Sequence, residues 1–455
     1  MTSNPHGWNE LDTSVQDLVA AAQDLAGYSG TDTFVDSSTS ARDISLARRK
    51  LCTAITRLQN LVTEPGDFIQ HLAHNTQLLA CIQWLGEFQV LACIPLSGSV
   101  PMRDVADLAD VSETQLSRIV RMTATADFLS EPQPGYISHT PLSAPFVTNL
   151  SYLDAAMLLA ETAAPAALHM TIATQRSLEK KGTGRRSERP EESAYNVAFH
   201  SSQTFQSACE QRPKLHRQWL AYLRYVGADH DAVIELLGGL DWFSLSGANI
   251  VDVGAHSTTT AKTLAKLNPT LSFIVQLSEI TGQQQDGASE NGNDGIGCNS
   301  GSDGSSRDLS RRIVVQYRTP GSPQMVKDAD VYLVRLPSLS AAVGGSSLRQ
   351  RILVELHTHA EVLRTNTSAT LILLLDLLLD TDDVHDSRDM RPTACLRDLS
   401  LWQMTNAWGM EMGELMELVN GVQDSMGRLV VTDKLRSRNG ATVALHAKYQ
   451  SKWGF

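Results

Sequence analysis

The first residues that could do chemistry follow a predicted strand in the second half of the chain. Residues 250–253 form this strand, and Asp252, Gly254 and His256 lie at its end, before a predicted helix over residues 259–267. A glycine at such a turn lets the backbone pass close to a ligand without a Cβ clash. We therefore treat this turn as the candidate ligand-binding loop.

Two histidines are the next candidates, because imidazole can act as a general base or as a metal ligand. His357 and His359 lie two residues apart on a predicted helix over residues 348–363. Positions i and i+2 of a helix do not face each other, so the two rings should point apart. We interpret both as ordinary helix residues rather than as a relocated base or a metal pair.

Other motifs for catalysis or metal binding are absent from the sequence. It contains no GxSxG, HExxH, Walker or paired zinc pattern, and the acidic run over residues 380–389 lacks the glycine and terminal glutamate of an EF-hand loop. The six cysteines are scattered without a CxxC pair, which is typical of reduced thiols in a cytosolic or nuclear protein. The sequence therefore predicts no metal site.

Length and charge limit the class of protein. The chain has 455 residues and a formal net charge of −12, and at about 150 residues per domain it should form two or three domains. Net acidity disfavours wrapping of nucleic acid, which depends on Lys and Arg. The most apolar run, residues 371–379, contains Asp376 and is far shorter than the about 20 residues of a membrane helix. We expect no membrane partner, and no secretory signal at the N-terminus.

The first half of the chain is predicted to be mainly helical. We expect a flexible arm over residues 1–45, a helical winged-helix domain of the dimerisation type over residues 46–175, and a charged linker over residues 178–193. The recognition helix of the winged helix would offer only Arg118 and Arg121 as basic groups, so the module is expected to dimerise or cover a pocket rather than to read DNA.

One segment of this first half is apolar on nearly every side. Residues 68–96 predict a helix that should be buried on most sides, most of all over residues 78–96. If a single chain does not cover this segment, a second copy should. A homodimer is therefore an open expectation.

Residues 194–455 predict a helical connection and then an α/β domain. From Asn249 onward, strands alternate with helices, which is typical of βαβ units and a doubly wound parallel sheet. The Gly-, Ser-, Asn- and Asp-rich tract over residues 281–310 cannot bury a core and is predicted to be a disordered insert. The fold class is therefore α/β, with an N-terminal helical and winged-helix region and a C-terminal Rossmann-like domain of the methyltransferase type.

This order of elements, with VDVG opening the second half, resembles O-methyltransferases that use S-adenosylmethionine. The resemblance implies a run of glycines after Asp252, where only glycine avoids the bound cofactor. Asp252 and Gly254 match, but the next glycine positions carry Ala255, His256 and Thr258. The motif is therefore vestigial, and we expect neither a bound cofactor nor cofactor-binding residues here.

Two further parts of the implied site are altered. At the ribose-binding acid of the second strand stands Leu277, with Glu279 displaced two residues onward. The His-Asp-Trp motif that supplies the general base in these enzymes is replaced by residues 337–347, which contain none of the three. No catalytic residue is therefore expected, and the protein is predicted not to be an enzyme.

Four longer blocks of sequence resemble the fungal AflS/AflJ-type transcriptional co-activators: LLACIQWLGEFQVLACIPLSGSVPMRDVADLADV (78–111), ESAYNVAF (192–199), QRPKLHRQWLAYLRYV (211–226) and VDVGAHSTTT (251–260). These methyltransferase-like proteins belong to aflatoxin, sterigmatocystin and anthraquinone polyketide clusters. The resemblance implies a non-catalytic nuclear protein, with some presence in the cytoplasm left open, that acts with a Zn(II)2Cys6 transcription factor and reaches DNA only indirectly.

Two enzymatic alternatives stay open at this point. The first is an S-adenosylmethionine-dependent O-methyltransferase with a rearranged site, using Glu279 for the ribose and His256 or His357 as base. The second is a methyltransferase-fold enzyme that cyclises a polyketide. The sequence does not identify the metabolite cluster, the residues that touch the partner, or the oligomeric state.

Overall fold

The chain was analysed as a computed structural model. It divides into two compact units, Met1–Ala144 and Pro145–Phe455, which are described separately. The described residues are 5–28, 37–180, 190–226, 230–238, 240, 242, 245, 247–255, 257–278, 311–336, 348–376, 392–406, 410–437 and 442–452.

The first unit begins with two long helices, α1 (Pro5–Gly27) and α2 (Ser37–Val62). They pack on each other and bury small residues such as Ala21 and Ala47 between them. The described parts of the predicted arm over residues 1–45 are therefore helical, because two amphipathic helices can cover each other where one alone cannot.

The apolar segment that follows is helical but interrupted. Helix α3 (Pro65–Glu87) ends before Gln89, which has a φ of 53°, and a short helix α4 (Val90–Cys93) follows. The expectation of burial on most sides is wrong within one chain: in α3 only Leu85 is buried, whereas Phe68 is 56% and Ile69 63% exposed. The N-terminal half of α3 therefore presents an apolar face.

The remaining elements of the first unit are three short strands and two helices, in the range predicted to contain a winged helix. They are β1 (Val100–Pro101), α5 (Met102–Leu108), α6 (Glu113–Ala124), β2 (Leu129–Ser130) and β3 (Tyr136–His139). The strands form an antiparallel sheet in the order β1-β3-β2. Buried Leu116, Val120 and Ile137 hold α6 against this sheet, and the guanidinium of Arg121 lies 3.7 Å from the carboxylate of Glu131.

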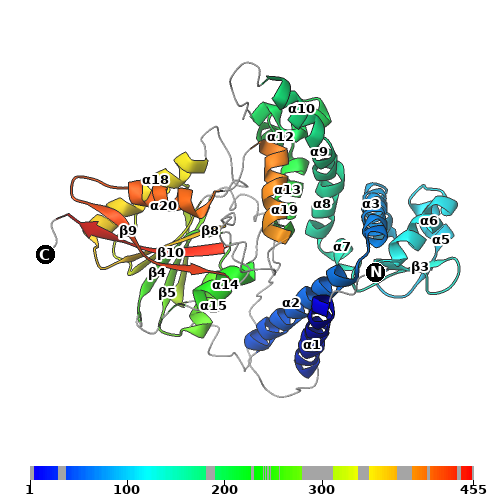
Figure 1. Ribbon diagram of the computed structural model, residues 1–455, viewed down its shortest axis with the longest axis horizontal. Helices are drawn as coiled ribbons and strands as arrows, with labels where there is room; N and C mark the ends of the chain where they lie inside the picture. The colour runs from blue at the N-terminus through cyan, green and yellow to red at the C-terminus, as the bar shows by residue number, and fades with distance from the viewer. Residues whose placement is uncertain are drawn as a thin grey trace, which may run out of the picture. The chain divides into compact units, whose positions relative to one another are not determined.

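The second unit opens with a bundle of helices (Figure 1). The bundle comprises α7 (Pro145–Thr148), α8 (Leu150–Leu158), a π-helical turn (Leu159–Ala163), α9 (Ala164–Leu168), α10 (Met170–Lys180), a 3-10 turn (Pro190–Glu192), α11 (Ala194–Phe199), α12 (Phe205–Gln211), α13 (Pro213–Val226) and, from late in the chain, α19 (Pro392–Thr405). Buried Tyr195, Phe205, Trp219 and Met404 lie in its core. A hydrogen bond of 3.0 Å between Tyr222 and Ser400 joins α13 to α19.

The boundary between the units differs from the predicted one. Residues 145–175 were expected in the first domain, but α8 packs on α13, where Arg217 donates to Asp154 at 2.8 and 3.0 Å. These residues therefore belong to the second unit. The predicted linker over residues 178–193 is helical at both of its ends, and its middle lies outside the described residues.

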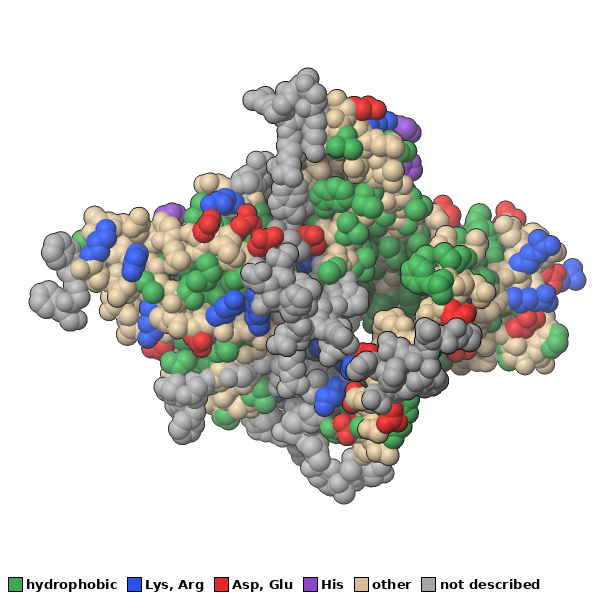
Figure 2. Space-filling view, viewed as in Figure 1, with side chains coloured by type: hydrophobic (Ala, Val, Ile, Leu, Met, Phe, Trp, Pro, Cys, Tyr) green, Lys and Arg blue, Asp and Glu red, His purple; other side chains and the backbone are tan. Residues whose placement is uncertain are grey.

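The helix over Leu150–Glu179 is long and apolar enough to cross a membrane by length and composition alone. Only 28% of its most apolar window is buried in the chain. Figure 2 shows hydrophobic side chains gathered on the visible face of these helices, and the exposed ones include Leu150, Leu159 and Leu168. The same helix carries Asp154 and Glu161, which pair with Arg217 and Lys214 of α13, so we interpret it as a bundle helix.

A sheet of seven strands forms the rest of the second unit and confirms the predicted α/β class. The strands are β4 (Asn249–Ala255), β5 (Ser272–Ser278), β6 (Ile313–Arg318), β7 (Val331–Arg335), β8 (Thr370–Asp376), β9 (Gly427–Arg436) and β10 (Thr442–Ser451). Their order is β6-β5-β4-β7-β8-β10-β9. The first five are parallel, and β10 is antiparallel to both β8 and β9.

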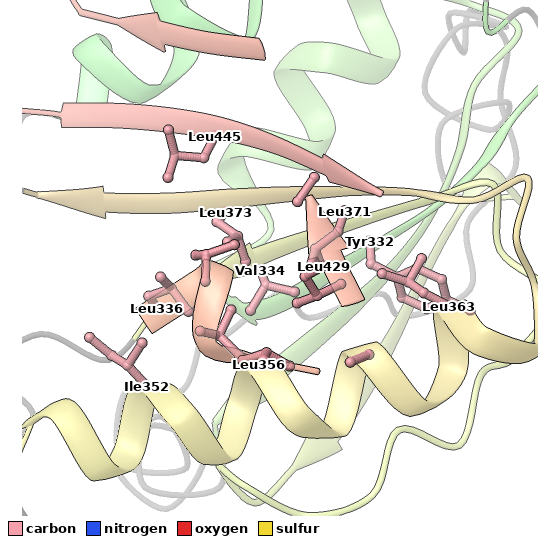
Figure 3. Packing of buried hydrophobic residues seen from close by; sticks show 14 of the residues in the cluster. Tyr332, Val334, Leu336, Ile352, Leu356, Leu363, Leu371, Leu373, Leu429 and Leu445 are labelled. Atoms are coloured by element: carbon pink, nitrogen blue, oxygen red, sulfur yellow. The ribbon is translucent and has the colours of Figure 1, made fainter. Parts of the chain in front are cut away.

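Helices cover both faces of this sheet. Helices α18 (Leu348–Thr365) and α20 (Met412–Gly421) cover one face, where Tyr332, Leu356 and Leu373 pack together (Figure 3). Helices α14 (His230–Gly238) and α15 (Thr259–Leu267) cover the other, around Phe273 and Leu264. The predicted insert over residues 281–310 lies outside the described residues.

Candidate functional site

An ion pair lies at the carboxyl end of β4, where the candidate loop begins. The side chain of Asp252 is buried, and Arg335 at the end of β7 donates to it through Nε at 3.0 Å and Nη2 at 3.2 Å. This bidentate geometry satisfies both carboxylate oxygens, which is the strongest pairing that a guanidinium offers. The carboxylate of Asp252 is therefore already committed to a cation of the same chain.

Gly254 is required by its backbone conformation. Its φ is 73°, and a Cβ at this position would lie 3.2 Å from the carbonyl oxygen of Arg335. A left-handed backbone and a close neighbour both favour glycine. The glycine thus serves the packing of β4 against β7 and would be kept whether or not a ligand binds.

The other positions of the loop predicted to be vestigial are partly described. Ala255 is fully buried and pairs with Leu277 after a bulge in β4. Thr258 precedes the first residue of α15 without a side-chain capping bond, and His256 lies outside the described residues. In the described part of the chain, the buried hydroxyl of Thr260 finds no hydrogen-bond partner.

The position expected for a ribose-binding acid is apolar. Leu277 is 7% exposed and packs in the cluster that contains Phe273 and Val275. It offers no hydrogen-bond acceptor, and its side chain faces the core. Glu279, the displaced alternative, lies outside the described residues.

The two histidines of α18 point apart, as their spacing predicts. His357 is exposed beside a pocket of about 80 Å³ that Arg364 and Asp424 also line. His359 is 1% exposed, packs edge-on against Tyr332, and shares a hydrogen bond of 2.8 Å between Nδ1 and the carbonyl of Glu355. Burial lowers the pKa of His359. The residues predicted to have lost the base motif, 337–347, lie outside the described residues.

A second arginine–carboxylate pair joins the end of β6 to helix α18. Arg318, at the end of β6, contacts both oxygens of Glu355 at 3.2 Å, and the backbone N–H of Gly321 also donates to Glu355. Both side chains are nearly enclosed, at 8% and 5% exposure. Neither arginine was predicted from the sequence. Arg335 ends the buried strand β7, and that position is a signal for a pairing carboxylate, whereas Arg318 ends the exposed strand β6 and carries no such signal.

Metal-ligating side chains do not gather anywhere in the described residues. The five described cysteines are free; Cys209 is buried, which raises the pKa of its thiol to about 12, whereas Cys52 and Cys395 are exposed. Burial therefore differs among the described thiols, and reduced thiols remain a prediction from the sequence. The acidic run over residues 380–389 lies outside the described residues.

Solved structures define the class of fold. OxaC covers 98% of this chain and 100% of its own, at a TM-score of 0.60 and 14% identity. The mitomycin 7-O-methyltransferase MmcR covers 85% of this chain and 98% of its own, at a TM-score of 0.54 and 14% identity. At such identity the likeness establishes the fold alone. The protein therefore has the methyltransferase fold, with a loop after β4 that departs from the glycine run implied for it.

Sequence comparison places the chain more closely. No family model matches it. The monodictyphenone cluster transcriptional coactivator mdpA of Emericella nidulans is 43% identical over 97% of both chains. A transcriptional coactivator of Pseudocercospora fijiensis is 50% identical over 84% of this chain and 99% of its own, and the dothistromin biosynthesis regulatory protein aflJ of Dothistroma septosporum is 42% identical over 89% and 88%. The chain belongs to this family of fungal transcriptional coactivators of metabolite gene clusters.

Proposed function

We propose that this protein is a non-catalytic transcriptional co-activator of a fungal polyketide gene cluster, working in the nucleus with a Zn(II)2Cys6 transcription factor. The observation that carries the proposal is the Asp252–Arg335 pair, found in a chain whose relatives are named coactivators. A carboxylate that an internal arginine already satisfies needs no cofactor to satisfy it.

The residues at the carboxyl edge of the sheet do not fit S-adenosylmethionine. Arg335 holds the Asp252 carboxylate in a bidentate ion pair, so that carboxylate is not free to accept hydrogen bonds from a ligand. Leu277 offers the ribose hydroxyls no acceptor. Together these residues leave the edge without the polar acceptors that the cofactor would need.

The DNA-binding function falls to the partner in this proposal. The chain is acidic, with a net charge of −12, and Arg121 on α6 lies beside Glu131. Few cations are therefore left on that helix to meet phosphates. A zinc-cluster factor supplies base recognition, and the co-activator supplies a protein surface.

A homodimer is part of the same proposal. The exposed apolar side chains of α3, including Phe68, Ile69 and Leu72, form a face that a second copy of the chain would cover. Sedimentation of the purified protein at several concentrations tests this point. A monomer at every concentration would exclude a stable dimer.

Two measurements test the proposed function together. Deletion of the gene should lower the transcripts of the neighbouring polyketide synthase cluster, and calorimetric titration of the purified protein with S-adenosylmethionine should show no binding. Binding tighter than about 100 μM, equivalent to more than about 5 kcal/mol, would favour the methyltransferase alternative. Unchanged transcripts after deletion would exclude a co-activator role. An active methyltransferase of the same fold is the positive control for the titration.

A further inference from the structure

A half-buried histidine of the first unit is bonded through both of its ring nitrogens. His139 ends β3, and its Nε2 lies 3.1 Å from the carbonyl oxygen of Leu91 in α4, while its Nδ1 lies 2.8 Å from the hydroxyl of Ser143. Leu91 is 2% exposed, and Ser143 is fully buried. The ring therefore joins β3 to the short helix α4.

These contacts fix the protonation state of the ring. A carbonyl oxygen only accepts hydrogen bonds, so Nε2 carries the proton and donates to Leu91. Nδ1 of a neutral imidazole is then an acceptor, and the hydroxyl of Ser143 donates to it. The oxygen of Ser143 in turn accepts from the backbone N–H of Thr140 at 3.1 Å. Each of these groups has a partner while the ring is neutral.

A second proton on the ring disrupts this arrangement. Nδ1 becomes a donor, so the hydroxyl of Ser143 has to accept from it and can no longer direct its own proton there. The same oxygen already accepts from Thr140, and the hydrogen bonds of the described residues offer the hydroxyl proton no other acceptor. A buried donor without a partner is costly. Protonation of His139 therefore weakens the junction between β3 and α4.

Charged groups do not offset this cost. The described segments around the ring read Val-Leu-Ala-Cys in α4, Val-Pro in β1, Leu-Ser in β2 and Thr-Pro-Leu-Ser-Ala over residues 140–144. The titratable residue of these four segments is Cys93, whose thiol donates to a backbone carbonyl at 3.6 Å. Glu131, which follows β2, already accepts from the N–H of Gly135 at 2.9 Å and lies beside Arg121.

Burial lowers the pKa of His139. The hydrogen bonds from the ring to the carbonyls of Leu91 and Ile94 oppose this shift without cancelling it. The ring therefore stays neutral in the folded protein at a pH where an exposed imidazole begins to charge.

We propose that His139 is a pH-sensitive switch that joins β3 to α4 while its ring is neutral and releases α4 from the sheet of the first unit when its ring is protonated. Helix α4 directly follows α3, which carries the exposed apolar residues Phe68 and Ile69. The switch thus acts next to the face for which we propose a second copy. It is independent of that proposal, because the junction opens whether or not a dimer forms.

Hydrogen–deuterium exchange on the full-length protein at pH 7.5 and pH 5.5 measures this opening, once each rate is divided by the rate of an unstructured amide at the same pH. The bonds of the neutral ring contribute fully above the ordinary pKa of about 6.5, and the contribution is lost as pH falls toward the depressed pKa of the folded ring. Corrected exchange of residues 90–94 and 137–143 should rise by about three- to ten-fold. A rise below two-fold overturns the proposal.

Two glutamine variants separate this ring from other groups that titrate in the same range. His139→Gln keeps an amide donor and acceptor but cannot take up a proton here, so the rise should fall below two-fold. His74→Gln is the matched control, because His74 also shares a hydrogen bond with a hydroxyl, that of Thr125 at 2.8 Å. This variant should keep the full rise. An equal rise in the parent and both variants overturns the proposal.

Nitrogen NMR of the parent protein, labelled in its histidine rings, checks the tautomer directly. At pH 7.5 the proton of His139 should be on Nε2, and the ring should be half-charged only below the ordinary value of about 6.5. A proton on Nδ1 at pH 7.5, or a ring already half-charged above that value, overturns the proposal. Thermal unfolding checks that each variant folds like the parent, and if His139→Gln does not fold, the NMR titration decides.

Discussion

The two buried arginine–carboxylate pairs of the sheet have the same chemistry but different surroundings. Arg318–Glu355 is closed on all sides, with side chains 8% and 5% exposed, and its carboxylate also accepts from Gly321. Arg335–Asp252 lies at the carboxyl edge, where the arginine side chain remains 16% exposed. The first pair is a structural link between β6 and α18. The second occupies the place where a methyltransferase fold keeps its functional loop.

The largest loss of stability is expected when one partner of the enclosed Arg318–Glu355 pair is removed. Arg318→Met should destabilise the protein by about 3–5 kcal/mol, because it leaves the Glu355 carboxylate buried without its cation. Chemical denaturation followed by circular dichroism measures the loss. The double variant Arg318→Met/Glu355→Leu should recover most of the stability, since it removes the stranded charge as well. A single variant as stable as the parent would show that the pair is not a structural link.

Removing the arginine of the Asp252–Arg335 pair should destabilise the protein less than removing Arg318. Arg335→Met is expected to destabilise by about 2–4 kcal/mol, because water reaches this pair and relieves part of the charge that remains on Asp252. The double variant Arg335→Met/Asp252→Asn should recover most of the stability that Arg335→Met loses. If Arg335→Met costs more than Arg318→Met, the contrast between a closed and an open pair is wrong.

Gly254 beside the edge pair gives a smaller and separable effect. Gly254→Ala should cost about 1–2 kcal/mol, from the left-handed backbone and from the Cβ placed 3.2 Å from the carbonyl of Arg335. Gly135 is the matched control, because its φ is 80° but nothing lies within 4 Å of its Cβ position. Gly135→Ala should therefore lose only the backbone part, about 1 kcal/mol. Equal losses at both positions would show that β7 yields to the added methyl group.

His359, next to the closed pair, should make stability depend on pH. Burial depresses the pKa of His359 in the folded protein, so its contribution is complete above the unfolded pKa of about 6.5 and is lost as pH falls toward the folded value. The slope is at most about 1.4 kcal/mol per pH unit for one proton. Glu355, Arg318 and Tyr332 face the ring.

Denaturation between pH 7.5 and pH 5 measures this slope. His359→Phe should flatten it, whereas His357→Gln, on the exposed side of the same helix, should leave it in place. Other groups that titrate in this range add a background that all three proteins share, so only the difference between them counts. A slope unchanged in His359→Phe would contradict the assignment.

The sequence predicted the sheet well and the contacts of its ends poorly. Residues 331–334 and 371–375 are apolar throughout, and a strand buried on both faces requires that pattern. The change in periodicity at Asn249 located the α/β domain. The same local signals located neither the boundary at Ala144, which depends on α8 packing against α13, nor the helical arm, which depends on α1 packing against α2.

At the candidate site, too, the sequence predicted the residue types but not the long-range contacts. The types of Asp252, Gly254, Ala255 and Leu277 can be read from the sequence, and they indicated a degraded loop. That Arg335 pairs with Asp252 could not be read, because the two residues are 83 positions apart and meet only through the order of β4 and β7 in the sheet. Long-range pairing of this kind is a property of topology.

The Asp252–Arg335 pair also bears on the direction in which such a fold can evolve. Restoring glycines at Ala255 and Thr258 would reopen the loop while Arg335 still holds the carboxylate. Removing Arg335 first would leave the Asp252 carboxylate buried without a cation. The fold would then lose stability with no ligand bound to compensate for it. Under the proposed function, a gain of cofactor binding would therefore need at least two changes, one of them destabilising alone. The salt bridge would oppose any route to cofactor binding that proceeds by single substitutions.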